Sequence, residues 1–119
     1  MTARRLIILG IDPGTRSTGW GVVSLQSGQP RAVACDVITP RATLPIDQRL
    51  LLIFEAIREV IGRYSPDEMA VEEPFVGENV RSAMAVGQAR TVAMLAGQTA
   101  IARGAPEPLA AGQVHSSSP

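Results

Sequence analysis

The chain has 119 residues, which fits one domain of ordinary size and leaves no room for a second. Hydrophobic residues make up 45% and charged residues 18%, so the chain is too apolar and too weakly charged to be intrinsically disordered. Eleven arginines are balanced by eleven acidic residues, and the net charge therefore does not indicate a nucleic-acid partner.

Cysteine usage and the length of the apolar runs bear on where the protein resides. The single cysteine, Cys35, excludes an internal disulfide and a zinc cluster built from paired cysteines. The N-terminal apolar run, Leu6–Ile11, is too short for a signal peptide, and the longest later run, Thr91–Ala102, falls short of the roughly 20 residues of a membrane helix. We therefore expect a cytoplasmic protein without a membrane segment.

The first part of the chain predicts three strands connected by short turns. The branched apolar run Leu6–Ile11 is typical of a strand buried on both faces, and it ends at Asp12. Turn-forming residues follow in Asp12-Pro13-Gly14-Thr15. The segments Gly19–Leu25 and Arg31–Ile38 predict the second and third strands, so we expect an antiparallel meander.

A helix and a parallel strand are expected after the meander. Apolar residues recur at helical spacing from Leu50 to Ile61, Pro45 suits the start of this helix, and Tyr64-Ser65-Pro66 suits its end. Glu68–Glu72 predicts a fourth strand. The connection before it has the length of a helix, which favours a strand parallel to an earlier one.

The last part of the chain predicts one more helix and then an irregular tail. Asn79 is suited to cap a helix over Val80–Ala102, whose many Ala and Gly residues permit close packing within the chain or between two copies. From residue 104 on, Pro, Gly, Ala and Ser dominate, and Val114–Pro119 has neither a strand nor a helix pattern. We therefore expect an α/β domain over residues 1–103 and an irregular tail over residues 104–119.

Two acidic residues stand at the ends of strands that are expected to be neighbours. Asp12 ends the first strand and Glu72 ends the fourth, so their carboxylates could meet at one edge of the sheet. Carboxylate oxygens are ligands that Mg²⁺ prefers, and a pair of such ions can activate water and stabilise the leaving oxygen of a phosphodiester. A plain turn role for Asp12, ahead of Pro13, explains its local pattern equally well.

Strand alternation leaves open which glutamate joins Asp12. Glu72 and Glu73 are adjacent, so they point to opposite faces of the strand and only one of them can face Asp12. The local pattern does not choose between them.

Glycines and an aromatic residue near these acids are further candidates. The glycines could cradle a phosphate, although Trp20 stands where a P-loop requires Lys, and tight turns with close strand packing explain them as well. They are Gly10, Gly14, Gly19 and Gly21. Phe75 could stack on a base while Asn79 and Arg81 hold the nucleic-acid backbone, and a role for Phe75 in capping the core is an equal alternative.

Four motifs in order resemble the RuvC family of Holliday junction resolvases, the crossover junction endodeoxyribonucleases. They are Ile8-Leu9-Gly10-Ile11-Asp12-Pro13-Gly14, Thr18-Gly19-Trp20-Gly21-Val22, Ala70-Val71-Glu72-Glu73-Pro74-Phe75 and Gly87-Gln88-Ala89-Arg90. The resemblance runs from Leu6 to Ala102 and implies an α/β, ribonuclease H-like mixed sheet, with three antiparallel strands, then a parallel strand, and flanking helices.

The resemblance also implies roles for the candidate residues. Asp12 and Glu72 match two of the family's four catalytic acids, which selects Glu72 over Glu73, and these acids hold Mg²⁺, with two ions expected in the complete family site. Phe75 matches the aromatic residue that helps to open or distort DNA at the crossover. Asn79 and Arg81 are the accompanying DNA-binding candidates.

Partners follow from the same resemblance. The helix over Val80–Ala102 lies where the family forms its homodimer, and a two-fold dimer suits two symmetric cuts in a four-way junction. Thr91 stands where the family usually has Gly, a departure that bears on packing at this helix. Four-way junction DNA and a branch-migration helicase complex are the other expected partners.

A larger departure concerns the end of the sequence. The family's other two acids lie on a C-terminal helix well beyond Glu72, whereas this sequence ends at Pro119 and Glu107 comes too early to be either of them. We therefore expect a nuclease domain over residues 1–103 whose C-terminal part is missing and which carries half of the metal site.

The resemblance therefore predicts a magnesium-dependent, structure-selective endonuclease that would hydrolyse phosphodiester bonds at four-way DNA junctions in recombination and DNA repair. The alternative is a non-catalytic dimer that binds junction DNA. A third alternative is a fragment of an actin-like or sugar-kinase-like ATPase, since that superfamily also has an Asp-x-Gly loop after its first strand. The length of 119 residues and the lack of a second phosphate loop in the sequence disfavour it.

Overall fold

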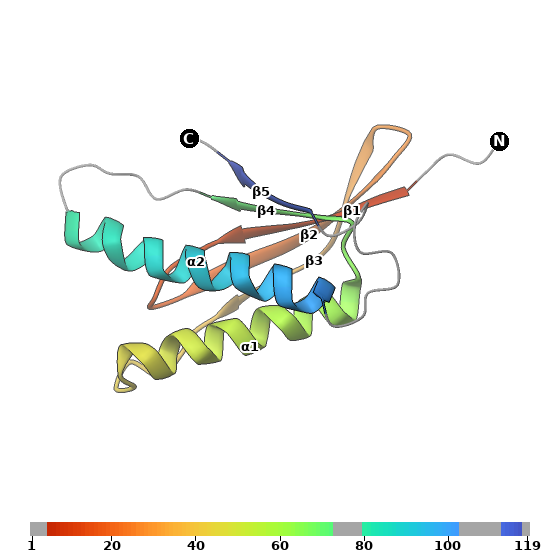
Figure 1. Cartoon of the computed structure of the whole chain (residues 1–119). Coiled ribbons are helices and arrows are strands. Elements are labelled where there is room, and N and C mark those ends of the chain that lie inside the picture. The colour runs from red at the N-terminus through yellow and green to blue at the C-terminus, as the bar shows by residue number, and fades with distance from the viewer. Residues whose placement is uncertain (1–4, 73–79, 103–112, 118–119) are drawn as a thin grey trace.

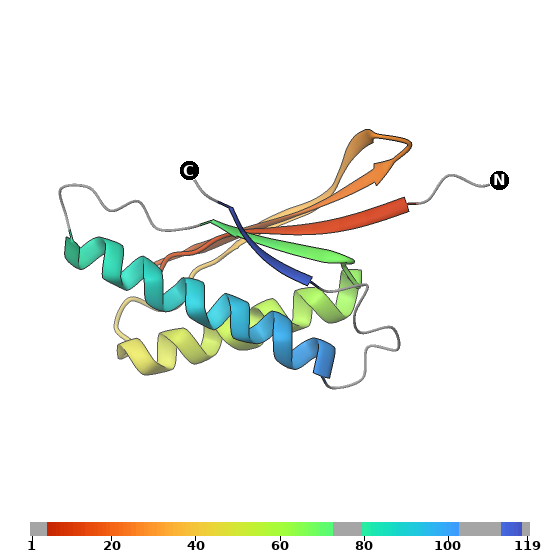
Figure 2. The same ribbon diagram turned by 45° about the horizontal axis from the view of Figure 1, so that its top comes forward.

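A five-stranded mixed sheet forms the centre of the protein. The computed structural model describes residues 5–72, 80–102 and 113–117, with side chains described for residues 5–72 and 87–99. In chain order the elements are β1 (Arg5–Asp12), β2 (Thr18–Gln26), β3 (Gln29–Ile38), α1 (Ile46–Tyr64), β4 (Glu68–Glu72), α2 (Val80–Ala102) and β5 (Gln113–Ser117). The strand order across the sheet is β3-β2-β1-β4-β5, and both helices lie on the same face (Figures 1 and 2).

The first three strands form the predicted antiparallel meander. β1 pairs with β2 along its whole length, and β2 pairs with β3. Two residues with positive φ, Ser27 at 54° and Gly28 at 76°, form the tight turn between β2 and β3. β3 starts at Gln29, two residues before the predicted start at Arg31, because β3 is an edge strand and tolerates Pro30.

α1 and α2 occupy the segments predicted to be helical. α1 begins after Pro45 and ends at Ser65, whose backbone is left-handed and whose N–H donates to the carbonyl oxygen of Ile61 at 2.8 Å. Pro66 follows, and it cannot continue the helix. Neither helix has both the length and the apolar character to cross a bilayer, as judged over the described parts of the chain.

α1 carries the chain back so that β4 pairs with β1 in parallel, as predicted. In this ladder Gly10 stands opposite Ala70 and Ile11 stands opposite Val71. A parallel pair requires a crossover of this kind, and α1 supplies it on one face of the sheet. The carboxyl ends of β1 and β4 therefore lie side by side.

β5 corrects the prediction for the tail. The sequence predicts an irregular segment there, but Gln113–Ser117 forms a fifth strand, parallel to β4. Val114 is the one residue of this strand with a strong preference for extended structure, so the local signal is weak. Pairing with the edge of β4, from Glu68 opposite Gln113 onward, stabilises the extended conformation, which local propensity alone does not favour. The rest of the tail, residues 103–112 and 118–119, lies outside the described residues.

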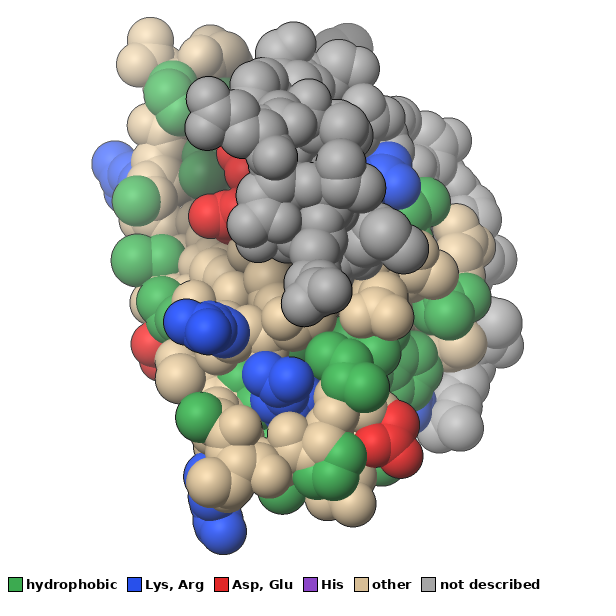
Figure 3. Space-filling model, turned by 90° about the vertical axis from the view of Figure 1, so that its left-hand side faces the viewer, with side chains coloured by type: hydrophobic (Ala, Val, Ile, Leu, Met, Phe, Trp, Pro, Cys, Tyr) green, Lys and Arg blue, Asp and Glu red, His purple; other side chains and the backbone are tan. Residues whose placement is uncertain are grey.

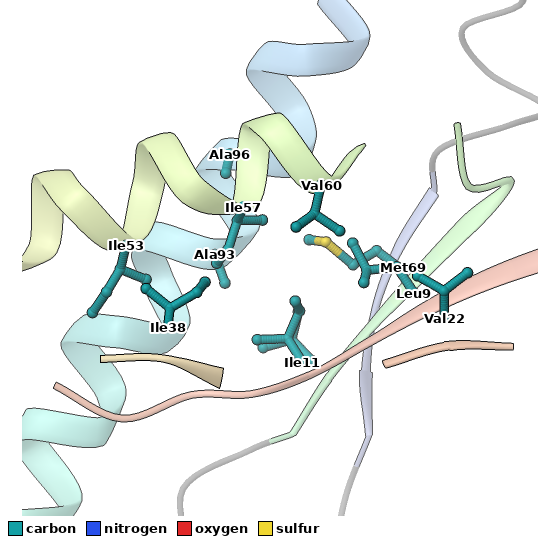
Figure 4. Packing of buried hydrophobic residues seen from close by; sticks show 11 residues of the cluster. Leu9, Ile11, Val22, Ile38, Ile53, Ile57, Val60, Met69, Ala93 and Ala96 are labelled. Carbon is teal, nitrogen blue, oxygen red and sulfur yellow. The ribbon is translucent and has the colours of Figure 1, made fainter. Parts of the chain in front are cut away.

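The core lies between the sheet and the two helices (Figure 4). Alternation along β1 turns Leu9 and Ile11 toward the helices and turns Gly10 and Asp12 toward the opposite face. The buried apolar side chains come from the sheet and from both helices, and they include Leu9, Ile11, Val22, Ile38, Ile53, Ile57, Val60, Met69, Val71, Ala93 and Ala96. The alanines of α2 are small, which lets this helix pack closely against α1 and the sheet.

Candidate active site

Asp12 and Glu72 end neighbouring parallel strands and share one face of the sheet. Ile11 and Val71 are opposite each other and buried in the core, so the next residue of each strand, Asp12 or Glu72, turns to the other face. Both acidic side chains are exposed there. Figure 3 views the molecule from the end toward which β1 and β4 run, where some of the acidic side chains gather in the upper part.

This register answers the question that alternation alone left open. Glu72 shares the face of Asp12 because Val71, the residue before it, is fully buried in the core. Glu73 lies outside the described residues. The placement of Glu72 therefore depends on which residues of β4 face the helices.

The carboxyl groups of Asp12 and Glu72 interact directly. The pKa of Glu72 is raised above its ordinary value, first because its protonated form hydrogen-bonds to Asp12, second because the two negative charges repel each other, and third because of slight desolvation. Two carboxylates held this close attract a proton or a cation. A hard divalent cation between them would relieve the repulsion that raises this pKa.

A hollow of about 370 Å³ opens to solvent beside the two carboxylates. Small residues line the base of this hollow, so the backbone of the sheet is accessible there. Residues that line it include Gly10, Gly19, Gly21, Ala70, Asp12 and Glu72. Three of the four glycines predicted to surround Asp12 are thus part of this hollow, and Gly14 lies in the loop that follows Asp12.

The donor set suits a hard cation but is small. Among the described residues, no group of three His, Cys, Asp or Glu side chains is close enough to enclose a metal ion. Mg²⁺ commonly takes one or two carboxylates and completes its coordination with water and substrate phosphate. The two acids therefore fit such an ion, with open positions facing the hollow.

The three predicted DNA-binding residues are not placed by the structure. Phe75 and Asn79 lie outside the described residues, and so does the predicted cap that Asn79 would make on α2. Arg81 belongs to the first turn of α2, but its side chain is not described. Their DNA-binding roles stay predictions.

Sequence reasoning missed one residue of the site. Thr18, the first residue of β2, is fully buried, and its hydroxyl group bonds to the backbone of Gly14 in the loop after Asp12. The available signal was a Thr placed four residues after a turn Gly, since Ser and Thr hydroxyls often bond to nearby backbone groups in turns.

The fold and the acid pair together define a ribonuclease H-like domain with carboxylates at the ends of β1 and β4. The family model described as crossover junction endodeoxyribonuclease RuvC matches residues 8–108. The chain belongs to this family.

Curated relatives agree with this assignment. The crossover junction endodeoxyribonuclease RuvC of Dehalococcoides mccartyi strain 195 is 47% identical over 89 residues, which are 75% of this chain and 54% of the relative. The protein of the same description from Azorhizobium caulinodans is 46% identical over 96 residues, which are 81% of this chain and 57% of the relative. The chain spans about half the length of the curated relatives it matches.

Solved structures show the same architecture. Thermus thermophilus RuvC in complex with a Holliday junction substrate matches with a TM-score of 0.77 and 27% identity, over 96% of this chain and 65% of that one. The yeast mitochondrial Holliday junction resolvase matches with a TM-score of 0.65 over 94% of this chain and 52% of that one. Its 13% identity supports the fold alone.

Proposed function

We propose that the chain carries one half of the catalytic centre of a Holliday junction resolvase, which hydrolyses phosphodiester bonds at four-way DNA junctions in recombination and repair. One observation carries the proposal: Asp12 and Glu72 meet at the carboxyl ends of β1 and β4, beside an open hollow. The name and the bound junction of the Thermus thermophilus relative supply the substrate class.

In this proposal the two carboxylates hold Mg²⁺, and two ions are expected in the complete family site. When bound there, Mg²⁺ supplies Lewis acidity that activates water and stabilises the leaving oxygen of the phosphodiester. Asp12 and Glu72 would hold the cation beside the hollow that they line. The small residues that floor the hollow leave room for a phosphate group next to the acids.

The DNA contacts and the assembly belong to the same proposal. Phe75 stacks on a base near the crossover while Asn79 and Arg81 bind the backbone. α2 forms a two-fold homodimer, which suits two symmetric cuts. The dimer works with a branch-migration helicase in the cytoplasm, where the DNA substrate is found.

Cleavage of a synthetic four-way junction in Mg²⁺ tests the proposal. The assay uses the chain beside a version extended through the downstream reading frame, which adds the family's other two acids, and in the cutting form we expect Asp12→Asn and Glu72→Gln each to abolish cleavage while junction binding, measured by gel shift, persists. Glu73→Gln is the matched control, since it removes the neighbouring carboxylate, and it should cut at the rate of the unsubstituted chain. Retained cutting by Asp12→Asn would contradict the site assignment.

The same experiment separates the alternative function. If the extended version also prefers junctions over linear duplex but never cuts them, with or without Mg²⁺, the protein is a non-catalytic binding dimer. In that case the substitution of Asp12 or Glu72 leaves every readout unchanged.

A further inference from the structure

The loop after Asp12 is closed by a buried side chain. Thr18 has a relative exposure of 0%. Its Oγ1 donates to the carbonyl oxygen of Gly14 at 2.7 Å and accepts from the backbone N–H of Gly14 at 3.1 Å. One hydroxyl group therefore pairs with both backbone polar groups of a residue that lies two positions after Asp12.

Close packing at Gly14 shows that this loop is tightly folded. A Cβ atom added at Gly14 would lie 2.5 Å from the carbonyl oxygen of Ser17, nearer than real Cβ atoms approach. Pro13 is buried as well. The segment from Pro13 to Ser17 is thus a tightly folded loop between Asp12 and Thr18.

The position of the loop matters for the acid pair. Asp12 is the last residue of β1 and stands opposite Gly19, the residue after Thr18. The Asp12 side chain is exposed, and the position of the backbone at the end of β1 determines which places its carboxylate can reach.

We propose that Thr18 is a positioning residue, whose two hydrogen bonds to Gly14 hold the loop so that the Asp12 carboxylate stays beside Glu72 and over the hollow. The proposal rests on the proposed function for the cation-binding role of the pair. Thr18 itself faces the core side of β2 and acts through the backbone of Gly14.

The test compares variants at Thr18 with a matched control. Thr18→Val keeps the shape but removes the hydroxyl group, whereas Thr18→Ser keeps the hydroxyl group. Ser24→Ala removes another buried hydroxyl group from the same strand, at its far end. Mg²⁺ affinity is measured by calorimetry, and the Gly14 amide exchange rate and the Asp12 Cγ chemical shift are measured by NMR without metal.

We expect Thr18→Val to weaken Mg²⁺ binding by about tenfold, a size typical of groups that orient metal ligands. The same variant should speed Gly14 amide exchange and move the Asp12 Cγ shift. Thr18→Ser, which keeps the hydroxyl group, should show the Mg²⁺ affinity, the Gly14 amide exchange rate and the Asp12 Cγ shift of the unsubstituted chain. Ser24→Ala should lower the melting temperature and leave all three unchanged, because its hydroxyl is remote from the loop.

Several results would overturn the proposal. One is a folded Thr18→Val with the Mg²⁺ affinity and the Asp12 Cγ shift of the unsubstituted chain. If Thr18→Val does not fold, a fast-exchanging Gly14 amide in the unsubstituted chain overturns it, and a protected amide with restored shifts in Thr18→Ser supports it. An unsubstituted chain that binds no Mg²⁺ refutes the proposed function, while the two NMR readouts still decide the role of Thr18.

Discussion

Asp67 and Ile7 form two reciprocal hydrogen bonds. The Ile7 N–H donates to Oδ2 of Asp67 at 2.7 Å, and the Asp67 N–H donates to the carbonyl oxygen of Ile7 at 2.8 Å. This pair ties the chain just before β4 to β1 and begins the register that ends at Asp12 and Glu72. A one-residue slip of β4 would turn Glu72 to the opposite face.

Removal of the Asp67 carboxylate should therefore weaken the pairing between β1 and β4. We expect Asp67→Ala to lower the free energy of unfolding by about 1–3 kcal/mol, because it leaves the Ile7 N–H without its charged acceptor. Urea unfolding measures the loss. Asp36→Ala is the control, since the Asp36 carboxylate accepts from the adjacent Val37 N–H at an exposed position. Equal losses in both variants would contradict a special role for Asp67.

The contact between Glu72 and Asp12 predicts a pH-dependent effect on stability. The pKa of Glu72 is raised in the folded protein by its hydrogen bond to Asp12, by charge repulsion and by slight desolvation. The folded state is therefore favoured below the ordinary Glu pKa and loses this advantage as the pH rises through the raised pKa. We expect Glu72→Gln to melt a few degrees higher than the unsubstituted chain near neutral pH without metal.

The size of this effect is limited because the pair is exposed and screened by solvent and salt. Melting curves in EDTA from about pH 4 to about pH 8 should show the difference shrinking toward the acidic end. Glu55→Gln, on the exposed side of α1, should give a difference that does not grow with pH. A Glu72→Gln variant that is less stable at neutral pH than the unsubstituted chain would argue against repulsion.

Divalent cations should stabilise the folded chain through the same pair. A ligand that binds only the folded state at a hundredfold excess over its Kd adds about 2.7 kcal/mol of stability. We expect MgCl₂ to raise the Tm of the unsubstituted chain and to have no such effect on Asp12→Asn. NaCl at matched ionic strength controls for screening, and an equal rise with both salts would speak against a specific site.

Core packing predicts a contrast between two positions of α1. Ile57 is fully buried against the sheet, whereas Leu51 is 58% exposed. Ile57→Ala should therefore cost about 2–5 kcal/mol of unfolding free energy, and Leu51→Ala should stay within about 0.5 kcal/mol. Chemical denaturation of both variants checks this, and similar costs would mean that α1 is rotated about its axis.

Two glycines predict opposite responses to the same substitution. Gly14→Ala forces a Cβ atom against the Ser17 carbonyl oxygen, so it should destabilise the loop beside Asp12. Gly62→Ala places a methyl group in open space on exposed α1, and it should stabilise the protein by about 0.5–1 kcal/mol through helix propensity. Thermal melts give both signs, and a stabilised Gly14→Ala would contradict the tight packing of the loop.

Most of the fold could be predicted from local patterns, because the elements that carry it have strong ones. The apolar run that forms β1, the helical spacing of α1 and the length of the crossover to β4 each follow from local sequence. β5 could not be predicted in this way. Its extended form depends on pairing with β4, a segment about forty residues away, and its own residues have little preference for a strand.

The site was predictable to a lesser degree, since it depends on register. Local alternation allowed either Glu72 or Glu73 to face Asp12, and the burial of Val71 places Glu72 on that face. The bond from Thr18 to Gly14 depends on how the loop folds back, which turn propensity alone does not specify.

The two faces of β1 have different roles, and this limits which substitutions and deletions the strand can accept. Leu9 and Ile11 contribute to folding on one face, while Gly10 and Asp12 line the hollow on the other. A substitution at one of these positions alters either the core or the hollow. The deletion of a single residue within the strand exchanges the two faces, so that apolar side chains enter solvent and a carboxylate enters the core. A replacement thus affects one face of the strand at a time, whereas a change in the length of the strand affects both.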